Sequence, residues 1–129
     1  MGAIRITVAI RNPAEPELVW EGEFLVDTGA TDTLVPRQHL ESIGLVPEGQ
    51  RSYGLAGGSE ILMDIAIARI EFMGDFTGGV VAFGAENAEP LLGVTALESV
   101  GVEVDPHNQT ISKLPATRMV GFRTIRSSL

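Results

Sequence analysis

Residues 24–31 of the chain read Phe24-Leu25-Val26-Asp27-Thr28-Gly29-Ala30-Thr31. Three apolar residues lead directly into an ionisable one, and Gly29 permits a tight turn or a close backbone approach. The chain becomes apolar again at Leu34-Val35 and then reaches Pro36. An unpaired buried carboxylate is costly, so an acid between two apolar segments indicates a rigidly held, sheltered group. The plainer interpretation is a strand, a turn stabilised by the Asp side chain and a second strand.

The rest of the chain has the pattern of short strands separated by glycine and proline turns. Apolar and polar residues alternate over 4–10 and again over 60–72, which predicts two half-buried strands. The glycine pair Gly57-Gly58 predicts a hairpin between the second of these and a strand over 50–55. Further strands are expected over 18–26 (with Gly22 as a candidate bulge), 33–35, 76–83, 102–105 and 110–114, and short helices over 37–43 and 95–100.

Composition limits the fold and the class of function. The 129 residues, 44% hydrophobic and 20% charged, suffice for one folded domain and are too few for two ordinary ones. The chain has no Cys, and His39 and His107 lie far apart, so we expect neither a disulfide nor a metal site. A net charge of −8 argues against a nucleic-acid partner. The pattern predicts a mostly β, closed or partly closed barrel, but does not by itself separate this barrel from others of similar size.

Charge is unevenly distributed along the chain. Residues through Asp105 carry all seventeen Asp and Glu and five of the nine Lys and Arg, a formal charge of −12, whereas the remainder carries +4. This tail is either a solvated basic segment or one that docks onto an acidic surface. No apolar run is long enough for a secretory signal or a membrane span, so we expect a cytoplasmic protein without a membrane partner.

Two segments in the right order carry a resemblance to a known family. The segment from Phe24 to Pro36, with Asp-Thr-Gly-Ala followed by Thr-Leu-Val, resembles the active-site loop of single-domain, retropepsin-like aspartic proteases. The second match is Leu91-Leu92-Gly93, followed by a helix-like stretch to Leu97. In that family an apolar-apolar-Gly segment passes beneath the active-site loop. The resemblance covers about residues 4–114 and implies a retropepsin-like closed β-barrel with one or two short helices.

The resemblance implies roles for particular residues. Asp27 would be the catalytic acid, within an active-site loop formed with Thr28, Gly29 and Ala30, and Leu91, Leu92 and Gly93 would support that loop. The hairpin over 51–61 would be a flap that covers the substrate. Its candidate substrate-binding residues are Tyr53, Gly54, Leu55, Ala56, Gly57 and Gly58. No metal or other cofactor is implied.

The proposed chemistry requires a second carboxyl, because one group must accept a proton from water while another donates one. No second Asp-Thr-Gly exists, and Asp75-Phe76-Thr77-Gly78, Asp105-Pro106 and Asp32-Thr33 all fail to match it. The second acid must then come from another copy of the chain, across the axis of a twofold homodimer. The family likewise implies obligate dimers. We therefore expect a protease domain over 1–114 and a tail over 115–129 that contributes a dimerisation strand.

Two positions depart from the retroviral pattern. Retroviral members carry an acid two residues after the motif glycine and an arginine just after the downstream glycine, where this chain has Thr31 and Val94. The departures fit each other, since the missing groups would pair, and they indicate a cellular, prokaryotic-type branch.

The sequence leaves three hypotheses for function. The first is an aspartic endopeptidase, active as a homodimer on an extended peptide or protein substrate. The second is a non-catalytic dimerisation or peptide-binding module of the same fold. The third is an unrelated small β-barrel in which Asp27 only stabilises a turn. Retention of Asp27, Thr28 and Gly29 together favours the first hypothesis over the second.

Overall fold

The strand pattern expected from the sequence is present in the computed structural model, which describes residues 3–117. The alternating segment over 60–72 is one strand with the expected bounds, and the helices lie within one residue of the expected ones. The elements are β1 (Arg5–Arg11), β2 (Val19–Asp27), β3 (Thr33–Pro36), α1 (Arg37–Ser42), β4 (Gly49–Gly54), β5 (Glu60–Phe72), β6 (Asp75–Gly84), β7 (Leu91–Gly93), α2 (Val94–Val100), β8 (Val102–Asp105) and β9 (Thr110–Lys113).

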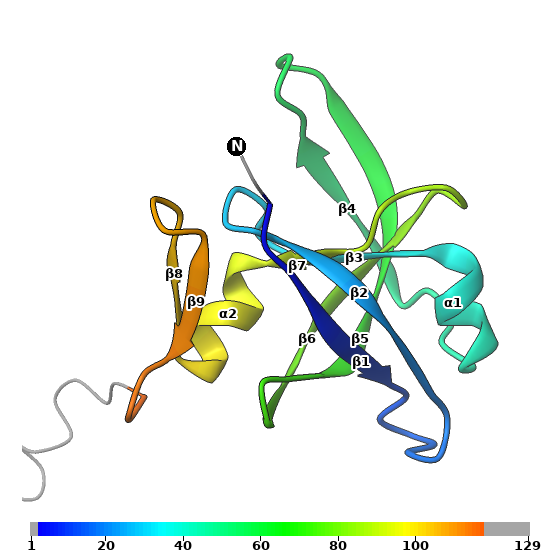
Figure 1. The fold of residues 1–129 in the computed structure, drawn as a ribbon. Helices are drawn as coiled ribbons and strands as arrows, with labels where there is room; N and C mark the ends of the chain where they lie inside the picture. Colours follow the sequence, from blue (N-terminus) through cyan, green and yellow to red (C-terminus); the bar gives the residue numbers. More distant parts are fainter. Residues whose placement is uncertain (1–2, 118–129) are drawn as a thin grey trace, which may run out of the picture.

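The described chain forms a closed barrel because its first strand also pairs with its fifth. The strand order is β1-β2-β7-β3-β6-β5-β4, and Ile10 of β1 pairs with Ile70 of β5 as well as with Trp20 of β2. Strand β4 stays outside this ring and pairs with β5 alone, so the β4–β5 hairpin extends beyond the barrel (Figure 1). These features confirm the predicted fold class, a mostly β closed barrel with short helices.

Alternate strand positions fill the barrel interior, because successive side chains of a strand point to opposite faces. The fully buried positions are mainly branched aliphatic residues, which pack well on a pleated surface. Helix α1 adds Leu40 and helix α2 adds Leu97 to the same core. The largest fully buried apolar side chains are Phe24, Ile10, Leu40, Ile70, Leu92, Leu97, Val8, Val35 and Val81.

Gly22 is not a bulge, contrary to the sequence-based expectation. The antiparallel register between β1 and β2 runs without interruption from Arg5↔Leu25 to Arg11↔Val19. Gly22 instead makes room for an aromatic ring, since a Cβ there would lie 2.6 Å from the Trp20 side chain. The Trp20 ring in turn stacks on His39 of α1, with ring centroids 4.2 Å apart. The glycine therefore serves packing between the barrel and α1.

Strands β8 and β9 form a separate hairpin that lies beside α2, away from the barrel (Figure 1). Val102 is buried and Val104 and Ile111 pack partly against the core, which attaches the hairpin to the domain. Most of the tail that is expected to contribute a dimerisation strand, residues 118–129, lies outside the described residues, and the proposed role of residues 115–129 stays a prediction. Neither helix within residues 3–117 has the length and apolar character needed to cross a membrane.

Candidate active site

Asp27 is the last residue of β2, and its own loop holds the carboxylate in place. The Gly29 N–H donates to Asp27 Oδ1 at 2.9 Å, and the Ala30 N–H donates to the Asp27 carbonyl oxygen at 3.2 Å. A Cβ at Gly29 would lie 3.3 Å from that carboxylate oxygen, closer than most such contacts, so glycine suits the turn. Asp27 is half-buried, while Thr28 and Gly29 are exposed. The carboxylate is therefore oriented and still accessible.

Strand β7 passes beneath this loop. It runs parallel to β2, with Leu25↔Leu91 and Asp27↔Gly93 in register. The Val94 N–H then donates to the Ala30 carbonyl oxygen at 2.7 Å, so the start of α2 also supports the loop. The structure thus brings Asp27–Ala30 and Leu91–Gly93 together, the arrangement that the resemblance implied.

Gly93 permits the closest of these approaches. A Cβ at this position would lie 2.6 Å from both the carbonyl carbon and the carbonyl oxygen of Asp32, and 2.8 Å from the Thr31 carbonyl oxygen. The Gly93 N–H donates to the hydroxyl of Thr33, which is 1% exposed, at 3.1 Å. The loop after Asp27 therefore rests directly on the β7 backbone.

The β4–β5 hairpin, here called the flap, is present at the segment that the sequence predicted to cover the substrate, and that role stays a prediction. Tyr53 and Gly54 end β4, and Leu55, Ala56, Gly57 and Gly58 form the turn. Gly58 has a φ of +90°, a conformation that favours glycine, and its N–H donates to the Leu55 carbonyl oxygen at 2.9 Å. Several apolar side chains of the hairpin are exposed, namely Leu55, Ile61 and Leu62. The flap therefore presents an apolar, uncovered surface in the single chain.

Asp32 joins the flap to the active-site loop, a role that the sequence analysis missed. Its Oδ2 accepts from the Arg51 guanidinium at 2.7 Å and from the Tyr53 hydroxyl at 2.6 Å. The Asp32 side chain is only 7% exposed. The sequence shows only that an acid follows Asp-Thr-Gly-Ala within the loop. The two partners of Asp32 lie nineteen and twenty-one residues further along the chain.

The electrostatics of this group favour the paired state. Burial and the hydrogen bond to Asp32 raise the pKa of Tyr53 to about 12, so its hydroxyl stays protonated and donates. The hydrogen bond to Asp32 also raises the pKa of Arg51, which is already far above neutrality. The flap therefore contributes one cation and one neutral donor to a single carboxylate oxygen.

A cavity of about 460 Å³ lies beside this group, lined by Asp32, Arg51, Ile67, Gly78 and Val80 among others. A second hollow, of about 890 Å³, lies on β1, β5 and β6. Asp27 lines neither cavity. Within residues 3–117, no group of three or more His, Cys, Asp or Glu side chains is placed to hold a metal ion.

The comparison with protein families gives one match. Residues 21–99, more than half of the chain, match the family described as gag-polyprotein putative aspartyl protease. The match spans Asp27 and its loop, the flap, β7 and almost all of α2. No curated protein matches the sequence. The family match and the closed barrel together place this chain in the retropepsin-like aspartyl protease family.

Proposed function

We propose that this protein is an aspartic endopeptidase that acts as a homodimer, with Asp27 as the catalytic acid of each subunit. The observation that carries the proposal is the Asp27 carboxylate, which the Gly29 N–H holds at the tip of a loop supported by β7. A carboxylate that only stabilised a turn would not need this second layer of support. Family membership adds the expectation of peptide-bond hydrolysis.

The chemistry needs two carboxyl groups that share one proton. The ionised group takes a proton from the attacking water, and the protonated group donates its proton to the carbonyl oxygen. The chain has one Asp-Thr-Gly, at Asp27-Thr28-Gly29. A twofold axis beside this loop would bring two copies of Asp27 together. Exposure of Thr28 and Gly29 in the single chain supports this, because both would be available for contact with a second subunit.

The flap supplies the cover over the substrate. An extended peptide would bind between the flap and the active-site loop as an added strand, with backbone hydrogen bonds for affinity and side-chain pockets for selection. Tyr53 and Gly54 would line this path, together with the turn from Leu55 to Gly58. The exposed Leu55, Ile61 and Leu62 favour apolar substrate side chains. Closing the flap would exclude water from the carboxylates and strengthen their electrostatic effects.

Cleavage of a pool of unstructured peptides, followed by mass spectrometry, tests this proposal. Asp27→Asn should reduce cleavage to background, whereas Asp75→Asn, at the half-buried first residue of β6, should retain it. Circular dichroism should show both variants folded, and sedimentation should show dimers. Activity of Asp27→Asn within about tenfold of wild type would remove Asp27 from the mechanism. A wild-type chain that binds peptides without cleaving them would instead be the non-catalytic module.

A further inference from the structure

Strand β4 has few side-chain connections to the barrel. It pairs with β5 alone, and within the described residues two of its four hydrogen-bonding side chains stay inside the hairpin: Gln50 donates to Asp64 and Ser52 to Glu60. The other two, Arg51 and Tyr53, both reach Asp32 in the active-site loop. Residues two apart on a strand share a face, so Arg51 and Tyr53 approach Asp32 from the same side of β4.

Asp32 is held in place by the residues packed around it. Its backbone lies against Gly93, where there is no room for a Cβ, and the next residue, Thr33, is buried and accepts the Gly93 N–H. Its side chain is 7% exposed, so it has little freedom of its own. A strand tied to Asp32 is therefore tied to the same β7 backbone that supports Asp27.

We propose that Asp32, Arg51 and Tyr53 form a latch that positions the flap over the active-site loop. These are positioning residues, and the inference that they affect catalysis rests on the protease function proposed above. Asp32 is mostly buried and one of its oxygens already binds a cation and a hydroxyl, so it is not a free acid for a basic substrate side chain. The latch instead sets the height and angle at which the flap meets a bound peptide.

Hydrogen exchange of the flap, read by mass spectrometry on the full chain without substrate, tests the latch directly. Asp32→Asn keeps the shape and removes the charge, and Tyr53→Phe removes one donor. Each should make the amides of residues 49–60 exchange about fivefold faster, as expected when a hydrogen bond to a charged group is weakened or lost. Amides of β1, β2 and β7 should keep their wild-type rates.

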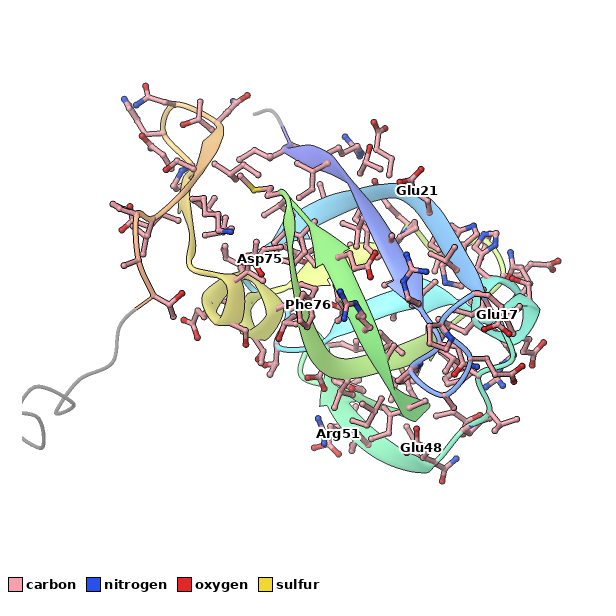
Figure 2. All side chains as sticks on the ribbon, turned by 90° about the horizontal axis from the view of Figure 1, so that it is seen from below. Glu17, Glu21, Glu48, Arg51, Asp75 and Phe76 are labelled. Atoms are coloured by element: carbon pink, nitrogen blue, oxygen red, sulfur yellow. The ribbon has the colours of Figure 1, made fainter. Side chains whose placement is uncertain are left out.

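The matched control is Asp75→Asn, which breaks another 2.7 Å ion pair, that between Asp75 and Lys113. Figure 2 shows Asp75 well separated from Arg51, so this variant should leave flap exchange unchanged. An unchanged rate over residues 49–60 in either Asp32→Asn or Tyr53→Phe would overturn the latch. This readout needs no activity, so it stands even if the chain proves not to be a protease.

Peptide cleavage then connects the latch to function. A loosened flap binds substrate less well, so both variants should raise KM about fivefold or more with a smaller change in kcat. Simple damage to folding would lower the fraction of active enzyme, which reduces kcat and leaves KM unchanged. A fall in kcat alone, with wild-type KM, would show that the three residues support the fold and do not position the flap.

Discussion

Replacing Gly93 by alanine should push the active-site loop off β7 and destabilise the fold. The added Cβ would lie 2.6 Å from the Asp32 carbonyl carbon and oxygen and 2.8 Å from the Thr31 carbonyl oxygen. These are backbone atoms, which cannot rotate away as a side chain can. We therefore expect a loss of about 3 kcal/mol in the free energy of unfolding, at the upper end of the range for overpacked sites.

Urea unfolding and thermal melts at one fixed protein concentration would measure this loss, because the melting temperature of the proposed dimer would depend on concentration. A loss of about 3 kcal/mol corresponds to a fall in Tm of roughly 10 °C for a domain of this size. Gly78→Ala is the matched control, since a Cβ there would meet nothing within 4 Å. It should leave stability unchanged or raise it by up to about 1 kcal/mol. If Gly93→Ala costs less than about 1 kcal/mol, the loop does not rest on β7 as tightly as described.

Three further perturbations test other parts of the structure. Thr33→Val leaves a buried backbone N–H of β7 without its acceptor and should lower the free energy of unfolding in urea by about 1–3 kcal/mol. Thr33→Ser keeps the hydroxyl and should retain most of that stability, so equal losses in the two variants would show that the hydroxyl is not the stabilising group. The hydrogen bond from Arg11 lowers the pKa of Glu71, so its contribution to stability is present at neutral pH and is lost as the pH falls below the ordinary carboxyl value of 4.5. The difference in Tm between wild type and Glu71→Gln should therefore shrink between neutral and acidic buffers, and a constant difference would contradict this assignment. Truncation after Leu114 should weaken the proposed dimer in sedimentation and lower the activity, and higher protein concentration should partly restore it. Unaltered dimerisation would show that the tail does not contribute to the dimer interface.

Most of the fold's elements could be predicted because their signals are local. The alternation over 60–72 predicts the bounds of β5, because a half-buried antiparallel strand repeats every second position. It does not give the buried face, since Ala66 and Ala68 are buried whereas Ile67 between them is exposed. The expectation of a bulge at Gly22 is wrong, because glycine is needed there to leave space for the Trp20 ring and not to bend the backbone. That ring stacks on His39 of α1, a contact that the sequence does not reveal. A glycine within a strand pattern indicates a bulge or a close approach, and only packing distinguishes the two.

The sequence by itself determined the strands other than β7, with bounds close to the observed ones, and the segment from Asp27 to Gly29 that marks the family. Tertiary structure alone decided that β1 meets β5 to close the barrel, because periodicity indicates that a segment is a strand but not which strand lies beside it. Tertiary structure also decided the role of Asp32, because the sequence shows only that Asp32-Thr33 is not a second Asp-Thr-Gly. The partners of the Asp32 carboxylate, Arg51 and Tyr53, follow it in the sequence only after β3 and α1. They contact it because the flap folds back over the loop.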